Sequence, residues 1–566
     1  MRKKRLIASL LTVPALIMMV SCSGGGGGND NDNINANANG NMNGDMNGNG
    51  NANANGNMNG NMNGGGGGSG GQSQADTYLF YSGSLYYVDP TNPSSPTKLE
   101  NQDIKDYFLP LTVTGYDANT NHYQGLHKKY IVYIVNGKIY KANAELSSGT
   151  PTPQQVSNIT DACEFEENFD EPLSPDDTYA LVRTAGNDAS CNTTDDKYYL
   201  IKLSLSSSDA PTSLGNKMVI DAYSSQETKT VEGFLVQEGN KLYECNTTLS
   251  TCNQLKDGVS DIEVIGAYDV NDPKYLINID GNLYTFDGAS KQLSSAPVVS
   301  GFGDPVEYIM DNNAIYVWYK QNSSGGVTDI IEKISFNTWN KTTLYNVTRP
   351  NLSLEGRPLG VQSLVLAKDY IVFGDVYLDN SNNPKIAIRA ISKDDDNVFD
   401  VETINPDENP QFIAVYDNRI FYNRLANSGF KYCYLDISSS STSSNCDGNG
   451  YIAGETIGQN GYFTPSDFVT PEKLIIVENC SMDSSNSYCF GGDVYIANPS
   501  DMSKNQIGSL PTDIKSFFAF GIGRYLLGQG NTNISDPKYD IFFISVPDSS
   551  LTRITNTPSI NEQVLF

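Results

Sequence analysis

This chain of 566 residues has only two histidines, His122 and His127, which limits the catalytic mechanisms that could use an imidazole. A Ser-His-Asp triad would need one of these imidazoles against a buried aspartate, and no Gly-x-Ser-x-Gly elbow precedes a predicted helix. Four residues lie between the two histidines, so they could form a metal pair only on a helix, but Gly125 and the polar neighbours favour a solvated loop. The sequence therefore predicts no catalytic residues and no histidine metal site.

Carboxylates could supply a second kind of chemistry, either cation binding or glycoside hydrolysis. One acidic run holds Glu164, Glu166, Glu167, Asp170 and Glu171, and another is Asp394–Asp396. Oxygen ligands of this kind suit Ca²⁺, but neither run has the spacing of a calcium loop, so we interpret both as solvated turns. Nothing selects a catalytic pair among the 65 acidic residues. We predict no cofactor, with Ca²⁺ as the alternative. We also predict that the protein is not an enzyme, with an enzyme as the alternative.

Cysteines give a clearer pattern. Eight cysteines remain when Cys22 is set aside, and an even number in an exported protein predicts disulfides. Proximity favours four local pairs, with Cys245 and Cys252 placed for a cross-hairpin bridge, although spacing alone does not exclude other pairings. No Cys-x-x-Cys occurs, so we predict no metal site. The four favoured pairs are Cys163–Cys191, Cys245–Cys252, Cys433–Cys446 and Cys480–Cys489.

Residues 1–21 have the features of a secretion signal. A basic stretch, Arg2–Arg5, precedes the apolar stretch Leu6–Val20, which is too short to span a membrane stably. The segment Met19-Val20-Ser21-Cys22 resembles the lipobox of bacterial lipoproteins, although Met19 stands where that family usually has leucine. The resemblance implies cleavage before Cys22, lipidation of Cys22 with palmitate, and anchoring to the cell envelope. In that family Ser23 favours the outer membrane. The alternative is an ordinary signal peptide that leaves Cys22 as a free thiol.

Residues 22–75 are almost entirely Gly and Asn with a few Met, Ala and Asp. Such a segment cannot bury a core, so we predict a disordered, low-complexity tether that spans about 170 Å when extended. The remaining residues, 76–566, form the third predicted region.

A repeated hairpin fills residues 76–566. Each copy has an aromatic-rich strand, a turn such as Asn136-Gly137 or Asp280-Gly281, and a second strand. The copies start roughly 40 to 60 residues apart, which is the period of a four-stranded propeller blade. The starts are Tyr78, Tyr130, Tyr179, Phe234, Tyr275, Ile315, Tyr370, Phe412, Leu474 and Tyr525.

We therefore predict an all-β fold, a β-propeller of about eight to ten four-stranded antiparallel blades. The C-terminal segment Glu562–Phe566 resembles a lone strand that could complete the first blade, which favours one closed ring. Two propellers in tandem are the alternative, because roughly 490 residues exceed most single domains.

The hairpin, an apolar strand followed by Asn, Asp or Gly and then Ile/Leu-Tyr, resembles the TolB-like propellers of bacteria. The Ser-Pro-Asp-Gly turn of that family is retained in part at Ser174-Pro175-Asp176-Asp177. The resemblance implies a scaffold of the periplasm or cell surface that binds proteins, peptides or glycans. The fold alone does not specify an activity.

The net charge of −28 argues against nucleic acid as a partner, because acidic surfaces repel phosphate. Trp339, in the turn Asn337–Asn340, is the candidate for ligand stacking on a sugar or protein. We expect a lipid-anchored envelope or cell-surface protein that attaches to the membrane through its N-terminal lipid. Its propeller would act as a protein-interaction or scaffold module. The alternatives are a carbohydrate-binding or polysaccharide-cleaving surface protein, and adhesion or self-assembly through the Asn/Gly tract.

Overall fold

The computed structural model describes residues 78–564 apart from short gaps. The signal peptide, Cys22, the tether and His127 lie outside the described residues and stay predictions. Within the described part, regular structure consists of β-strands and one 3-10 turn, η1 (Pro175–Asp177), and no helix is long and apolar enough to cross a membrane. The gaps are 83, 101, 111, 113–114, 118–121, 125–128, 145–150, 171–173, 187–189, 225–229, 270–273, 324, 355–356, 405–407, 427–428, 439–441, 457–461, 464–468, 483–488, 522–524, 534–537 and 557–561.

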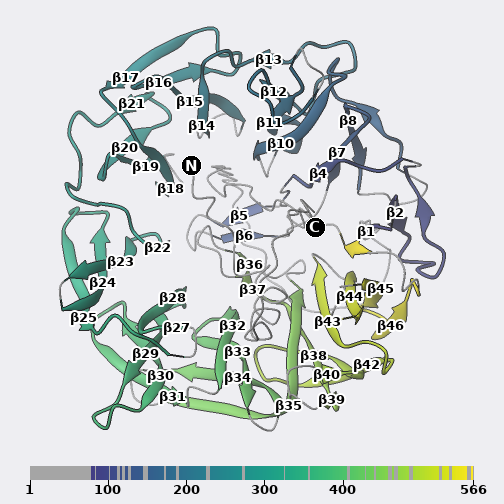
Figure 1. The fold of residues 1–566 in the computed structure, drawn as a ribbon, viewed down its shortest axis with the longest axis vertical. Helices are drawn as coiled ribbons and strands as arrows, with labels where there is room; N and C mark the ends of the chain where they lie inside the picture. The colour runs from purple at the N-terminus through teal and green to yellow at the C-terminus, as the bar shows by residue number, and fades with distance from the viewer. Residues whose placement is uncertain are drawn as a thin grey trace, which may run out of the picture. The chain divides into compact units, whose positions relative to one another are not determined.

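The described chain divides into two compact units. The N-terminal unit contains residues 78–277 and Thr285–Leu293, and the C-terminal unit contains Asn278–Tyr284 and Ser294–Val564. In each unit antiparallel sheets follow one another in chain order (Figure 1). One four-stranded sheet consists of β18 (Ile262–Asp269), β19 (Lys274–Ile279), β20 (Asn282–Asp287) and β21 (Gln292–Leu293).

The N-terminal unit is built from consecutive antiparallel meanders and a separate short hairpin, β5 (Gly115–Asp117) with β6 (His122–Gln124). The meanders are β1 (Tyr78–Tyr81), β2 (Leu85–Val88) and β3 (Thr97–Lys98); β4 (Asp106–Phe108), β7 (Tyr130–Val135), β8 (Lys138–Asn143) and β9 (Gln154–Gln155); β10 (Ala162–Phe169), β11 (Tyr179–Thr184), β12 (Lys197–Lys202) and β13 (Thr212–Ser213); and β14 (Met218–Ser224), β15 (Val231–Glu238), β16 (Lys241–Asn246) and β17 (Cys252–Asp257).

The C-terminal unit continues the pattern with longer strands. Its meanders are β22 (Glu307–Met310), β23 (Ala314–Ser323), β24 (Gly326–Ser335) and β25 (Lys341–Arg349); β28 (Gly360–Leu366), β29 (Tyr370–Leu378), β30 (Pro384–Ser392) and β31 (Val398–Ile404); β32 (Asn409–Tyr416), β33 (Arg419–Ala426), β34 (Gly429–Ile437) and β35 (Thr442–Thr456); β38 (Lys473–Glu478), β41 (Gly492–Ala497) and β42 (Lys504–Leu510); and β43 (Ser516–Gly521), β44 (Tyr525–Asn533), β45 (Lys538–Ser545) and β46 (Ser550–Arg553). Short elements are β26 (Ser353–Leu354), β27 (Arg357–Pro358), β36 (Tyr462–Phe463), β37 (Val469–Thr470), β39 (Ser481–Met482), β40 (Cys489–Phe490) and β47 (Gln563–Val564).

Strand β35 belongs to two sheets. Its first half pairs with β34, and from Gly450 onwards it pairs with β38. Gly450 has φ +155°, and a side chain there would collide with the carbonyl of Val477. Glycine is therefore required where the strand leaves one sheet and enters the next.

Hydrophobic cores lie between successive sheets. Phe108, Val132 and Ile139 of one sheet pack with Phe165 and Val182 of the next. The same relation recurs in the C-terminal unit, where one core joins β22–β25 to β28–β30 and another joins β28–β31 to β32–β34. Four-stranded meanders that pack face to face in chain order are the blades of a propeller. The prediction of an all-β, propeller-type fold is confirmed, while closure into one ring stays a prediction.

The repeat has one irregularity. Most of the predicted opening strands are the second strand of their sheet, as β19 and β29 are, but the strand that contains Phe412 is the first strand, β32. The predicted turns are present, with positive φ at Asn136, Gly137, Asp280 and Gly281. Asp417, with φ +52°, gives the β32–β33 hairpin a similar turn, which explains why the sequence pattern is the same although the strand position differs.

Candidate functional site

The eight cysteines after Cys22 form disulfides, in the four pairs that the spacing favours. The Cα–Cα distances are 5.8 Å for Cys163–Cys191, 4.0 Å for Cys245–Cys252, 4.3 Å for Cys433–Cys446 and 5.3 Å for Cys480–Cys489. Cys245 and Cys252 face each other directly in the β16–β17 register, which is the cross-hairpin geometry expected from sequence. Sequence proximity therefore identified the disulfides correctly.

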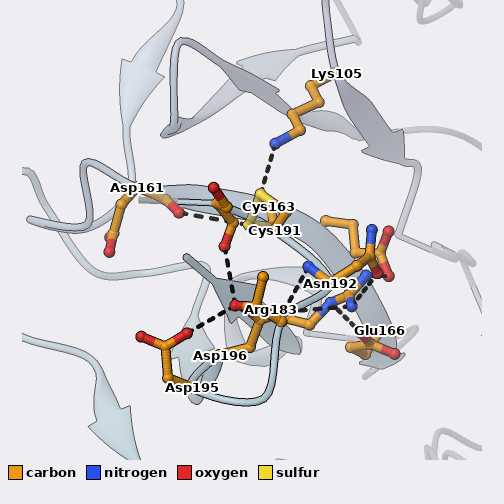
Figure 2. The surroundings of a disulfide bond; sticks show 12 residues. Lys105, Asp161, Cys163, Glu166, Arg183, Cys191, Asn192, Asp195 and Asp196 are labelled. Atoms are coloured by element: carbon orange, nitrogen blue, oxygen red, sulfur yellow. Dashed lines mark hydrogen bonds and ion pairs between the residues drawn. A yellow bond between two sulfur atoms is a disulfide. The ribbon is translucent and has the colours of Figure 1, made fainter. Parts of the chain in front are cut away.

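One of these disulfides fixes a loop. Cys163 lies in β10, and Cys191 belongs to residues 190–196, which we call the braced segment, in the connection between β11 and β12 (Figure 2). Arg183 of β11 holds the same segment by donating to the side-chain oxygen of Asn192 and by pairing with Asp196 at 3.5 Å. A covalent bond and a guanidinium thus attach the segment to two different strands.

Arg183 is surrounded by acceptors. Besides Asn192 and Asp196 it binds Glu164, and its Nε lies 2.8 Å from an oxygen of Glu166. Burial acts to raise the pKa of Asp196, but hydrogen bonds from Thr193 and the Asn192 backbone, with the charge of Arg183, hold that pKa below its ordinary value. Two members of the first acidic run, Glu164 and Glu166, therefore belong to an ion-pair cluster around Arg183.

The described carboxylates of the two acidic runs are not arranged as a calcium-binding site. Glu164 and Glu166 pair with Arg183, and Asp396 of the second run pairs with Lys333 at 2.9 Å. Among the described residues, no group of three or more His, Cys, Asp or Glu side chains could hold a metal ion. Glu171 lies outside the described residues.

Lys105 reaches the same disulfide from the chain just before β4. Its ammonium lies 3.0 Å from Cys191 Sγ, and Figure 2 shows the side chain directed at the sulfur. Cys163 is buried, with 2% of its surface exposed, whereas Cys191 is half-buried. The exposed sulfur of the pair is thus the one that has a cation beside it.

The turn Ser174–Asp177 has a structural function. Asp176 receives a hydrogen bond from the Tyr130 hydroxyl at 2.8 Å and ion pairs from Lys129 and Lys141 at 3.1 and 3.3 Å. Burial opposes ionisation, but these donors hold the pKa of Asp176 below its ordinary value. The neighbouring Asp177 pairs with Lys202 at 2.5 Å. The turn, which directly precedes β11, therefore links β7 and β8 of one sheet to β12 of the next sheet.

A buried charge network joins two sheets of the C-terminal unit. Arg349, at the end of β25, pairs with Asp375 of β29 at 2.7 Å and with Asp329 of β24 at 3.4 Å, and both carboxylates are fully buried. The Trp318 indole donates to Asp329 at 2.9 Å, and the Tyr345 hydroxyl donates to Asp375 at 2.9 Å. Burial, with the charge of Asp375, raises the pKa of Tyr345 to about 12, so Tyr345 stays a neutral donor.

Glu455, near the end of β35, is the described carboxyl with the most unusual environment. It is 9% exposed, and no described residue donates a hydrogen bond to it. Burial raises the pKa of Glu455 to about 7. A carboxyl that titrates near neutrality can exchange protons, but no second acid or base is placed against it in the described part, so geometry does not define a catalytic pair.

Trp339, the predicted stacking residue, lies in the turn between β24 and β25, and its role in ligand binding stays a prediction. Trp339 sits in its turn with φ +58°, half-buried, and its ring packs on Phe336 at a centroid distance of 5.8 Å. His122 lies in β6 rather than in the predicted loop.

One of the residues that the prediction missed has a signal in the sequence. Asp375 interrupts the otherwise apolar strand β29, which is the pattern of a buried carboxylate, whereas Glu455 lies in the mostly polar strand β35 and has no such signal. The approach of Lys105 to Cys191 has no sequence signal, because 86 residues separate the two.

The comparisons with known proteins assign no family. No protein-family model matches the chain, and no curated protein matches it significantly. Solved structures with some similarity include a eukaryotic initiation factor, at 11% identity over 78% of this chain and 99% of that one, TM-score 0.36. A puromycin-hydrolyzing peptidase of Mycobacterium tuberculosis has 7% identity over 67% of this chain and 52% of that one, with a TM-score of 0.30. An oligogalacturonate lyase of Vibrio parahaemolyticus has 10% identity over 60% of this chain and 85% of that one, with a TM-score of 0.26. Similarities of this size assign no function.

Proposed function

We propose that this chain is a lipid-anchored cell-envelope protein whose TolB-like propeller binds another protein and catalyses no reaction. The observation that carries the proposal is the braced segment, held by the Cys163–Cys191 disulfide and by Arg183. A loop that is already fixed loses little conformational entropy when it binds a partner.

The surface of the braced segment suits protein recognition. Ser190, Asn192 and Thr194 are exposed, and Tyr198 in the adjoining strand β12 is 39% exposed. Small polar residues beside an exposed tyrosine are the combination that recognition loops use, because tyrosine supplies contact area at low entropic cost. The acidic groups of the cluster are engaged with Arg183, which leaves them poorly placed for acid–base chemistry.

The membrane anchor is tested by replacing Cys22 with serine. We expect full-length C22S to move from the membrane fraction to the soluble fraction, because serine cannot accept the thioether-linked lipid and the leader alone is cleaved. Metabolic labelling with a palmitate analogue should mark the native protein and not C22S. Equal labelling of both proteins would contradict lipidation at Cys22.

The binding function is tested by placing a photo-crosslinking amino acid at Tyr198 in cells. We expect a discrete crosslinked protein band from position 198. The same probe at Val398, which is 36% exposed on β31, should give no such band. Absence of a crosslink at 198 would contradict binding at this surface, and turnover of a substrate by the purified protein would contradict the non-enzymatic assignment.

A further inference from the structure

We propose that Cys191 is a site of thiol–disulfide exchange, activated by Lys105, at which the protein forms a mixed disulfide with a small thiol or a cysteine of another protein. Three observations carry this inference. The Lys105 ammonium lies 3.0 Å from Cys191 Sγ, the two sulfurs differ in exposure, and the braced segment has a second anchor. The proposal does not depend on the proposed function.

The position of the cation favours reaction. An intact disulfide sulfur is a weak acceptor, so the contact gains little energy in the oxidised protein. During exchange, however, negative charge spreads over the reacting sulfurs, and a nearby ammonium stabilises it. Lys105 forms no ion pair with any described carboxylate, and Asp161, Asp195 and Asp196 belong to the surroundings of the disulfide (Figure 2). Lys105 therefore also offsets the repulsion that these acids exert on an incoming thiolate.

Exposure determines which sulfur is attacked. Cys163 is 2% exposed in β10, so an external thiolate reaches Cys191 first. The thiolate attacks Cys191 Sγ, a new S–S bond forms, and the bond to Cys163 breaks with Cys163 leaving as a thiolate. A second thiolate then attacks the external sulfur of the mixed disulfide, which releases Cys191 as a thiolate paired with Lys105 and yields an oxidised external disulfide. The two electrons come from the external thiols.

The fold can withstand the opening of this bond. Arg183 still binds Asn192 and Asp196 when the disulfide is open, and the Asn192 backbone still donates to Asp196 at 2.8 Å. The braced segment therefore keeps a noncovalent anchor to β11. The β16–β17 bridge has the same asymmetry of exposure, with Cys245 fully buried and Cys252 half-buried, but no cation contacts either of its sulfurs among the described residues, so the two bridges differ in Lys105.

The test uses reduced glutathione on the full-length native protein, with alkylation of free thiols and mass spectrometry of each cysteine peptide. We expect the Cys163–Cys191 bond to open faster than the Cys245–Cys252 bond, with a transient glutathione adduct on Cys191. Lys105→Met should slow the opening about tenfold, the effect of one unit charge at this distance in water. Lys105→Arg should restore most of the rate.

Lys368→Met is the matched control, because Lys368 is an exposed lysine remote from any described sulfur contact. Its rate should equal that of the native protein, and thermal unfolding should be the same for all variants. Equal rates in native protein and Lys105→Met would overturn the proposal. Equal opening of the two disulfides, or an adduct on Cys163, would overturn it as well.

Discussion

Replacing Arg349 with methionine is expected to lower the free energy of unfolding by about 3 to 5 kcal/mol, the usual cost of removing one partner from a buried ion pair. Methionine keeps the aliphatic length but removes the charge that faces Asp329 and Asp375. Asp375 would retain Arg389 at 3.3 Å, whereas Asp329 would retain only Lys320 at 4.0 Å among its described cationic partners. The loss arises mainly from the carboxylates that stay buried without compensation.

Denaturant unfolding of R349M and of the native protein would measure this loss. The matched control is Lys368→Met, which breaks an ion pair at 3.9 Å whose side chains are 65% and 66% exposed. Exposed pairs contribute about 0 to 1 kcal/mol, so K368M should unfold almost as the native protein does. A similar stability for R349M and K368M would show that the buried network contributes nothing beyond packing.

This network also shows why the fold was predictable and its polar contacts were not. Hairpins such as Tyr275–Asp287 can be predicted from alternating apolar residues and a positive-φ turn, which are local features of the sequence. The ion pair of Arg349 with Asp375 links two different sheets across 26 residues, and its partners are fixed only once those sheets pack. Local patterns therefore predict blades, while contacts between blades need the structure.

The candidate site also combines features that could be predicted from the sequence with contacts that could not. The pair Cys163–Cys191 could be predicted because chain proximity favours local disulfides in an exported protein. Arg183 was not predicted, because the acidic run from Glu164 looks like a solvated turn until β11 places a guanidinium against it. Trp339 was chosen for its turn position, and the packing of its ring on Phe336, three positions earlier, is a contact that the spacing alone does not specify.

The second large effect concerns pH. Burial raises the pKa of Glu455 from 4.5 to about 7, so between these values the folded protein holds a proton that the unfolded chain releases. Stability therefore falls as pH rises through this window, by about 1.4 kcal/mol per pH unit, and the full cost of about 3 kcal/mol is present above pH 7. Glutamine keeps the shape of the protonated carboxyl and cannot ionise.

We therefore expect Glu455→Gln to be more stable than the native protein by about 3 kcal/mol at pH 8 and equally stable at pH 4, in denaturant unfolding across this range. Taking the difference between the two proteins removes the contribution of carboxyls such as Asp176, whose lowered pKa acts in the opposite direction at acidic pH. Glu238→Gln, at an exposed position, is the control for the chemical change from glutamate to glutamine. A constant difference between E455Q and native protein at every pH would mean that Glu455 does not take up a proton on folding, and that its carboxylate is solvated or paired in the native state.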